Sequence, residues 1–369
     1  MFRDTGEVPD LKSLAFRKIV VQLFQCNVHR HGIKDATVIV KAFVRRAPLP
    51  ADMRDSLLAS CTESFSDVHR WWEKHGEIFQ DRKAHRSQHL RLFFDTLVWN
   101  PNTITVDDLA SAKRIIETNR DWPQLQFQFA CAYALESVLK NDFDKIWMRA
   151  FKKKLNDHPL YDFWFAYLHN TEINLFDQGP ALTPHQLVSL AFQWAVSFGY
   201  IELTKFFWHK VTPAQGEYVA MLQWRNLIRS CKHKDAFAFL CDKLCGVNAV
   251  NVIRITTPIF LHSIQNASDK ELSITAKDTY VTRVKFLLTN GCDRLRKGLF
   301  EAQNYRALTI CMQRKNAKMI RLLQSVVTPQ QMMAAVERVG VDFPMYQVEA
   351  ARNMTSGSRA RALRQWSMG

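Results

Sequence analysis

The residues best suited to chemistry are four soft metal ligands in one stretch: Cys231, His233, Cys241 and Cys245. Cysteine and histidine are preferred zinc ligands, and Cys241 and Cys245 are one helical turn apart. The pattern C-x-H-x7-C-x3-C is not the spacing of a standard zinc finger. Small thiols also pack well between helices. We therefore assign no metal ligand here and expect no cofactor.

Two histidine pairs and one acidic pair fit surface or helix-end roles. His85 and His89 lie four residues apart but lack the glutamate of a zinc-protease helix. His69 and His75 flank two tryptophans, and we expect both on a helix surface. Asp107-Asp108 stands at a predicted helix start, where carboxylates favour the positive end of the helix dipole. None of these residues is assigned a catalytic role.

Sequence motifs for nucleophilic catalysis or phosphate binding are absent. The chain has no G-x-S-x-G, G-x-x-x-x-G-K or G-x-G-x-x-G, and no strand is expected before the serines of Thr355–Arg361. We predict no enzyme activity. A site built from sequence-distant residues stays open, and a deep pocket with displaced pKa values would favour it.

The composition favours a folded, helical chain. Its 369 residues are 47% apolar, which excludes a mainly disordered protein. Glycine and proline, 12 each, are about 3% of the chain, below the usual roughly 7% and 5%. Few turn residues argue against a β-sandwich and against a glycine-fingerprinted nucleotide fold.

Apolar spacing predicts helices along most of the chain. The clearest are Leu14–Phe24, Leu90–Trp99, Leu109–Ile116 and Phe129–Leu139. Val38–Val44 is short and β-branched, so its type stays open.

Four segments of the second half resemble one another. Each has a polar fourth residue and an apolar pair at positions eight and nine, which predicts a short helix with one buried stripe. They begin at Gly199, Lys232, Thr279 and Lys315, with steps of 33, 47 and 36 residues. Similar segments of the first half begin at Ser64 and, more loosely, at Asn141. The long second step predicts an extra loop containing Ser263–Glu271.

Helix starts recur with these segments. The pattern T-P-x-Q begins at Thr183, Thr212 and Thr328. Threonine can cap the helix, proline fits its first position, and glutamine can bond back to the cap. We expect capping boxes there, the last two at the same offset from their segments.

The period and the segment KFLLTNGCD (Lys285–Asp293) resemble ankyrin repeats. The residues that match the family's pattern are Val284, Leu287, Leu288, Gly291, Cys292 and Asp293, with Gly199 and Glu202 at an inter-helix turn. The family's T-P-L-H-x-A is nowhere intact, since Thr257-Pro258 is followed by a displaced His262. The resemblance covers residues 181–335 and implies protein recognition on a concave face, with no contact residue carried over. A HEAT-like or unclassified helical array is the alternative.

The chain is basic, with 50 Lys and Arg against 35 Asp and Glu, a net charge of +15. From Cys292 to Gly369 there are 13 basic and 5 acidic residues. This balance favours acidic partners, whether nucleic acid, an anionic membrane surface or an acidic protein face. The basic residues of the end of the chain include Arg359, Arg361 and Arg364, next to Trp366.

Membrane insertion and secretion are not expected. The longest uncharged stretch, Gln178–Ile201, has a dense apolar part shorter than the roughly 20 residues that a spanning helix needs. The start of the chain has no apolar signal core, and the eight cysteines form no disulfide framework. We predict no signal peptide, no membrane partner, reduced thiols, and a cytoplasmic or nuclear protein.

Together these features predict an all-α helical-repeat solenoid of stacked helix-turn-helix pairs, ankyrin-like in its C-terminal half. We expect a helical N-terminal region at 1–180, ankyrin-like repeats at 181–350 and a basic flexible tail at 351–369. The predicted function is a non-catalytic scaffold or adaptor that binds another protein. The alternative is a nucleic-acid-binding helical array that uses the basic C-terminal region.

Overall fold

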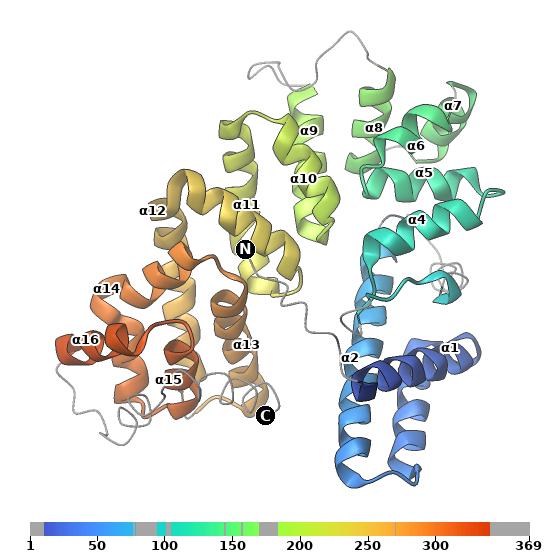
Figure 1. Ribbon diagram of the computed structural model, residues 1–369. Coiled ribbons are helices and arrows are strands. Elements are labelled where there is room, and N and C mark those ends of the chain that lie inside the picture. The colour runs from blue at the N-terminus through green and yellow to red at the C-terminus, as the bar shows by residue number, and fades with distance from the viewer. Residues whose placement is uncertain are drawn as a thin grey trace. The chain divides into compact units, whose positions relative to one another are not determined.

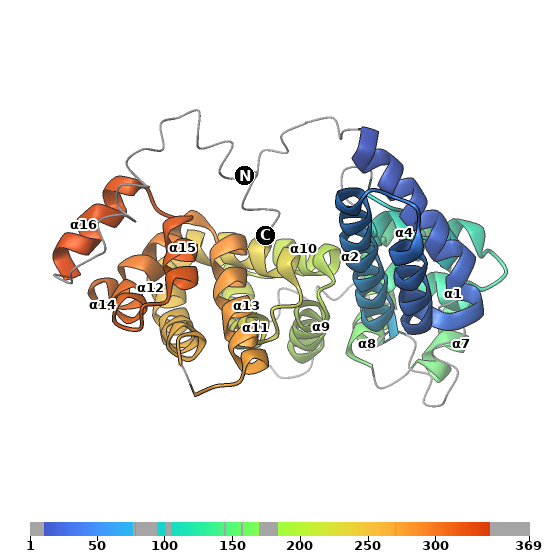
Figure 2. The same cartoon turned by 90° about the horizontal axis from the view of Figure 1, so that it is seen from below.

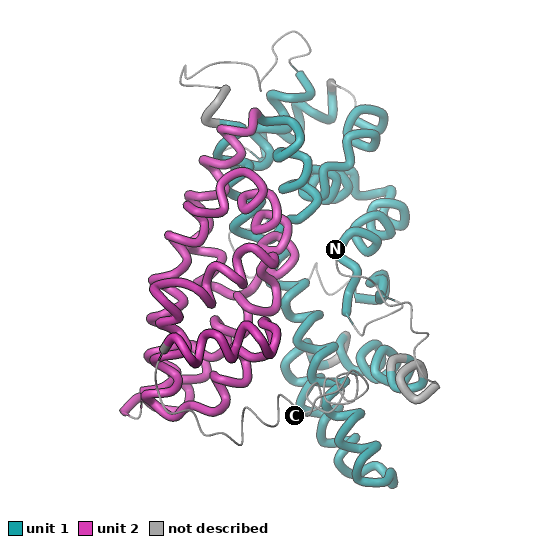
Figure 3. Tube along the Cα trace, turned by 60° about the vertical axis from the view of Figure 1, so that its left-hand side comes forward, with its two compact units in different colours: residues 1–211 teal, residues 212–369 magenta. Residues whose placement is uncertain are grey.

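The computed structural model describes residues 11–76, 78, 94–100, 105–143, 145–155, 158–169, 184–269 and 271–339. In this part of the chain the elements are helices, and the only strand-like pairing is an isolated bridge between Trp99 and Val106 (Figure 1). The all-helical class predicted from the sequence is therefore confirmed for these residues. Contacts divide the chain into two compact units, residues 1–211 and 212–369 (Figure 3).

Unit 1 is a succession of helices that pack on near neighbours in the chain. α1 packs on α2, α4 on α5, α5 on α8, α8 on α9, and α9 on α10. The elements are α1 (Leu11–Arg46), α2 (Ala51–Gly76), the 3-10 turn η1 (Phe94–Thr96), α4 (Asp108–Thr118), α5 (Pro123–Ala132), α6 (Glu136–Asn141), α7 (Lys145–Lys154), α8 (Pro159–His169), α9 (Pro184–Phe198) and α10 (Ile201–Lys210).

Unit 2 continues with further helices, two of which are kinked. Its elements are α11 (Pro213–Ser230), α12 (Lys234–Ala267), α13 (Ile274–Asn290), α14 (Asp293–Gln313), α15 (Ala317–Gln324) and α16 (Pro329–Val339). α12 bends at Asn248, whose side chain accepts a hydrogen bond from Asn251 N and so caps the second segment. α14 bends where residues 302–305 leave helical geometry.

Helices two apart in sequence pack on one another within unit 2. α12 contacts α14 and α14 contacts α16, while α13 contacts α15 (Figure 2). α11 packs on α12 and also contacts α13. The buried indole of Trp224 on α11 donates to Thr256 Oγ1 on α12 at 2.8 Å, so polar bonds as well as apolar packing join these helices.

The boundary between the two units follows residue 211, later in the chain than the boundary at 180 that the sequence predicted. α9 and α10, which carry the first self-similar segment at Gly199, belong to unit 1. The expected basic tail at 351–369, with Arg359, Arg361, Arg364 and Trp366, lies outside the described residues.

Left-handed residues mark the turns between successive helices. Gly199 has φ 72°, as expected for an inter-helix glycine, and Tyr200 N donates back to Ala195 O at 2.9 Å. Ala134 and Lys315 adopt the same conformation, with φ of 50° and 53°, and the same backward bond follows each. Cys231 ends α11 at φ 53°. The turn geometry therefore recurs where glycine does not.

Two of the three expected capping boxes are formed. At α11, Gln215 N donates to Thr212 Oγ1 at 3.4 Å and Thr212 N donates to Gln215 Oε1 at 3.1 Å. At α16, Thr328 and Gln331 make the same two bonds at 3.2 and 2.9 Å. Thr183 lies outside the described residues.

Two sequence-predicted helices are wrong in extent. Among the described residues 94–99 of the predicted helix Leu90–Trp99, Phe94–Thr96 forms a 3-10 turn, and the chain then leaves helical structure and Trp99 pairs with Val106. Residues 90–93 lie outside the described part. The predicted helix Phe129–Leu139 divides into α5 and α6, because Ala134 adopts a left-handed conformation between them.

The predicted extra loop in the second half is mostly helix. Ser263–Ala267 completes α12, and only residues 268–273 separate that helix from α13. The extra chain length between the Lys232 and Thr279 segments therefore lengthens a helix. Val38–Val44, whose type was open, belongs to α1.

One helix of the described residues, α12, is long and apolar enough to cross a membrane by length and composition. Its two segments pack on α11, α13 and α14 within unit 2, as a core helix does. α9, in the uncharged stretch considered above, is apolar but shorter.

Candidate functional site

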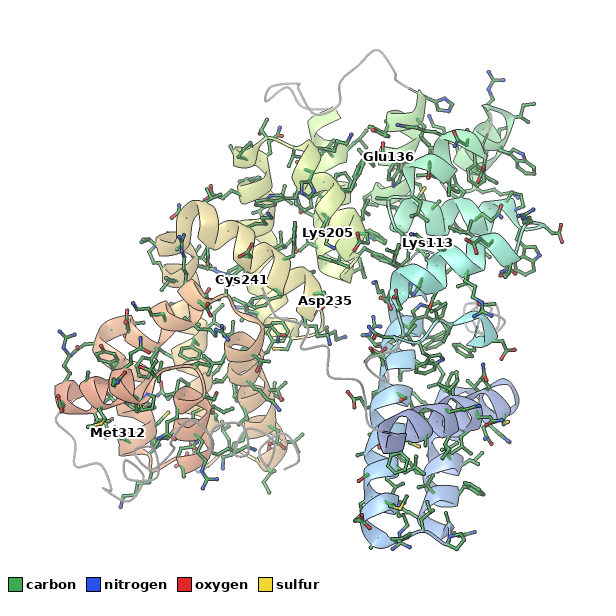
Figure 4. The ribbon with its side chains drawn as sticks, viewed as in Figure 1. Lys113, Glu136, Lys205, Asp235, Cys241 and Met312 are labelled. Carbon is green, nitrogen blue, oxygen red and sulfur yellow. The ribbon has the colours of Figure 1, made fainter. Side chains whose placement is uncertain are left out.

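The four soft ligands of the sequence analysis do not come together as a group. Cys231 is the end of α11, where its thiol donates to Ile228 O at 3.1 Å, and His233 precedes α12. Cys241 and Cys245 lie one turn apart on the buried face of α12 (Figure 4 labels Cys241).

A third cysteine joins this pair from a distant segment. Cys292, 51 positions after Cys241, precedes α14, and the sulphur atoms of Cys241, Cys245 and Cys292 all lie within 4.8 Å of one another. We call this set the three-thiol cluster. Sequence spacing missed it because the contact depends on the packing of α14 against α12.

Hydrogen bonds set the protonation order of the three-thiol cluster. Cys241 Sγ donates to Cys292 Sγ at 3.4 Å, and Cys292 N donates to Cys241 Sγ at 3.2 Å. The pKa of Cys292 is lowered because its sulphur accepts from the thiols of Cys241 and Cys245 and from backbone N–H groups at the start of α14. The pKa of Cys241 is raised because it donates to its two neighbours and is buried.

A second cluster of ionisable groups joins α2 to α4 in unit 1. Arg70 donates two bonds to the Asp108 carboxylate, at 2.8 and 2.9 Å, and Lys74 Nζ donates to it at 2.6 Å. Asp67 accepts from Arg70 Nε and from Val106 N, both at 2.6 Å. The Lys74 side chain is 4% exposed. Although burial raises the pKa of Asp108, Lys74 and Arg70 hold it well below its usual value.

His75 lies beside these ion pairs in the interior of unit 1. The expectation that it is on the helix surface is wrong, because its side chain is fully buried. Burial lowers its pKa from 6.5 to about 3, so the imidazole is neutral at pH 7. Its Nδ1 lies 2.6 Å from Trp71 O, which can only accept, so the proton is on Nδ1 and Nε2 accepts from Tyr133 at 2.7 Å.

Two tyrosines, Tyr200 and Tyr133, contact this second cluster. Tyr200 donates its hydroxyl hydrogen to Lys74 O at 2.9 Å, and the Lys74 ammonium lies 4.6 Å from the centre of the Tyr200 ring. Tyr133 is 2% exposed, and burial raises its pKa well above the usual value. With its hydrogen-bonding atoms directed at one another, this cluster stabilises the packing of α2, α4 and the turns before α6 and α10.

The acidic pair singled out in the sequence has two separate roles. Asp107 caps α4 by accepting from Ala110 N at 2.9 Å, as predicted for a helix start. Asp108 is the first residue of α4, as predicted, and it also forms the buried ion pairs described above, a role that helix-dipole reasoning missed. His69 is partly exposed next to Glu73, whereas His85 and His89 lie outside the described residues.

Exposed apolar side chains mark a surface of unit 2. Tyr218 and Leu222, one turn apart on α11, are 64% and 47% exposed. Val247 and Val250, on either side of the α12 kink, are 58% and 77% exposed. Asn248 Nδ2 donates to Glu217 Oε1 at 3.4 Å, which holds the kink beside the start of α11. We call these four apolar residues the α11–α12 patch.

Comparison with known proteins adds no family to these observations. No protein-family model matches the chain, and neither a curated protein nor a solved structure does.

Proposed function

We propose that this chain is a non-catalytic scaffold that binds another protein through stacked helix pairs, ankyrin-like toward its C-terminal half. The observation that carries the proposal is the alternating contact pattern of unit 2. α12, α14 and α16 follow one another in contact, and α13 and α15 do the same. A helix pair that cannot bury its own apolar stripe gains stability from such neighbours, and the stack leaves long faces for a partner.

The recurring turns support the same architecture. Left-handed residues at Gly199, Cys231 and Lys315 each stand in a turn between two successive helices. The capping boxes at Thr212 and Thr328 open helices α11 and α16. These shared local structures favour descent from one repeated unit, with ankyrin-like spacing, over an unrelated series of helices.

The α11–α12 patch is the surface we propose for the partner. Isolated exposed apolar residues are ordinary, but apolar side chains on two linked helices favour association. Arg225 and Arg254 are exposed one turn after Leu222 and Val250, and so lie on the same helix faces. Residues 212–339 hold 19 Lys and Arg against 9 Asp and Glu. The partner that fits this surface is a protein segment with both apolar and acidic side chains.

Affinity capture with mass spectrometry tests this function when each sample is divided and one half is treated with nuclease. We expect the captured proteins to survive nuclease and to be lost from the variant Tyr218→Ser/Val250→Ser. The control is Ile146→Ser, which removes an equally exposed apolar side chain from α7. Capture that ends with nuclease, and affinity for DNA or RNA that falls steeply with salt, would favour the nucleic-acid-binding alternative instead.

A further inference from the structure

The three-thiol cluster brings ligands of one chemical kind together from two elements. Cys241 and Cys245 come from the first segment of α12, and Cys292 is the residue before α14. The sulphur of Cys292 is 3.4 Å from that of Cys241, far longer than the roughly 2.05 Å of a disulfide. The three sulphurs are therefore separate donors, and all lie within 4.8 Å of one another.

The spacing of these sulphurs matches what a tetrahedral metal ion requires. Zinc–thiolate bonds of about 2.3 Å place neighbouring sulphurs roughly 3.8 Å apart. The observed separations, 3.4 Å for one pair and no more than 4.8 Å for any, bracket that value.

The surroundings supply the positive charge and donors that such a site needs. Three thiolates around a divalent cation leave one negative charge. Cys292 N donates to Cys241 Sγ at 3.2 Å, and the Arg294 guanidinium donates to Cys245 O at 3.1 Å. Donors of this kind around the ligands orient them and stabilise the charge. The positive end of α14 adds to this stabilisation.

Simple packing explains the other buried cysteines better than it explains this set. Cys61, Cys131 and Cys311 are each fully buried and belong to no such group within the described residues. Cys292 is only half-buried and stands at an N-cap position, where Ser, Thr, Asp or Asn is preferred. Its half-exposed position gives an ion a path to the cluster.

We propose that Cys241, Cys245 and Cys292 bind one Zn²⁺ ion as three thiolates, with water as the fourth ligand. Binding releases the thiol protons to solvent and changes no oxidation state. Because the ligands come from α12 and from the residue that precedes α14, the bound ion fastens the α13–α14 connection to the first segment of α12. This inference is independent of the α11–α12 patch.

Cobalt substitution tests the site in the full-length, reduced protein. We expect one Co²⁺ per chain, with an intense thiolate-to-cobalt charge-transfer band and tetrahedral visible bands that Zn²⁺ abolishes by displacement. Cys292→Ser removes the charge-transfer band or weakens it by about a third, in proportion to the lost thiolate. Cys311→Ala, a buried cysteine of the same unit, and Cys231→Ser, from the set suggested by sequence spacing, leave it unchanged.

Differential alkylation of the unmodified chain keeps the test valid if the cysteine variants do not fold. Zn²⁺ should slow the modification of Cys292 by at least tenfold and leave that of the exposed Cys26 unchanged. Two outcomes would overturn the proposal: no stoichiometric cobalt binding with equal Cys292 alkylation in both conditions, or cobalt binding that requires Cys231 and not Cys292.

Discussion

Two junctions between sequence-distant helices hold ionisable groups with displaced pKa values, and they use those groups differently. At the α2–α4 junction of unit 1, Asp108 accepts from Arg70 and Lys74, and the neighbouring His75 has both ring nitrogens engaged. At the α12–α14 junction of unit 2, the three-thiol cluster includes a half-exposed cysteine. At the first junction the Asp108 carboxylate and both ring nitrogens of His75 have partners within the protein, whereas the second junction brings three metal-ligating sulphurs together.

The difference shows that a displaced pKa is not by itself a sign of chemistry. The pKa values of His75 and Tyr133 are shifted as those of a catalytic acid or base often are, yet both side chains are buried away from solvent. Their partners are other groups of the same junction, so their role is to hold helices together. We expect the α2–α4 junction to respond to substitution with large stability changes.

The largest expected effect is from Asp108→Asn. The variant keeps the shape of the side chain but leaves the Lys74 ammonium, 4% exposed, without its carboxylate partner. Breaking a buried ion pair in this way typically costs about 3–5 kcal/mol. We expect a loss of that size in the free energy of unfolding, measured by urea denaturation followed by circular dichroism.

The matched control is Glu117→Gln, which makes the same chemical change on an exposed residue of α4. Its effect should stay within about 0.5 kcal/mol. Equal effects of the two substitutions would show that the α2–α4 junction is solvated, which would remove its contrast with the three-thiol cluster.

The second prediction is a pH dependence that originates from His75. Its pKa is about 3 in the folded chain against 6.5 ordinarily, so between these values the unfolded chain binds a proton that the folded chain does not. The contribution of His75 to the free energy of unfolding is therefore fully present above about pH 6.5. It falls as the pH drops toward 3, by about 1.4 kcal/mol per pH unit in that window. Urea denaturation at several pH values measures the slope.

Replacing His75 separates its contribution to the pH dependence of stability from the contribution of the carboxylates. His75→Leu should reduce the slope between pH 6 and 4 by roughly one proton equivalent. Phe129→Leu, which alters a ring packed 5.4 Å from the same imidazole, should lower stability at every pH and keep the slope. A slope unchanged in His75→Leu would mean that the imidazole titrates alike in both states.

The part of the fold that depends on local sequence was predictable. Apolar spacing indicated the helical class, and the capping boxes at Thr212 and Thr328 form because their partners are three residues away. The turn at Gly199 was found because glycine accepts positive φ readily. Ala134, Cys231 and Lys315 adopt the same conformation without glycine, so composition could not reveal them.

The candidate sites depend on contacts between segments distant in sequence, and here local reasoning failed. Cys292 lies 51 positions from Cys241, and His75 is buried because Tyr133 and Tyr200 approach it from other elements. Asp108 does stand at the start of α4, but its ion pairs could not be predicted because its partners Arg70 and Lys74 belong to α2. A local signal did exist for Cys292, which stands where a capping residue was expected.

The smallest expected change in stability comes from a substitution that tests close packing at the α12–α14 junction. A Cβ added at Gly298 on α14 would lie 2.3 Å from Ile253 Cδ1 and 2.8 Å from its Cγ1. Isoleucine is stiff in a helix, so this overpacking costs about 1–3 kcal/mol and exceeds the gain of about 1 kcal/mol in helix propensity. Gly298→Ala should therefore destabilise by about 1 kcal/mol in urea denaturation. Gly246→Ala, where nothing lies within 4 Å, should be neutral or stabilise.

A double-mutant cycle with Ile253→Ala shows whether the effect comes from that contact. Removing the isoleucine opens the space that the new methyl group needs, so Gly298→Ala should become neutral or stabilising in this background. If instead its cost is the same with and without Ile253, the helices do not approach closely at Gly298. The packing of α14 against α12, which also brings Cys292 to Cys241 and Cys245, would then need revision.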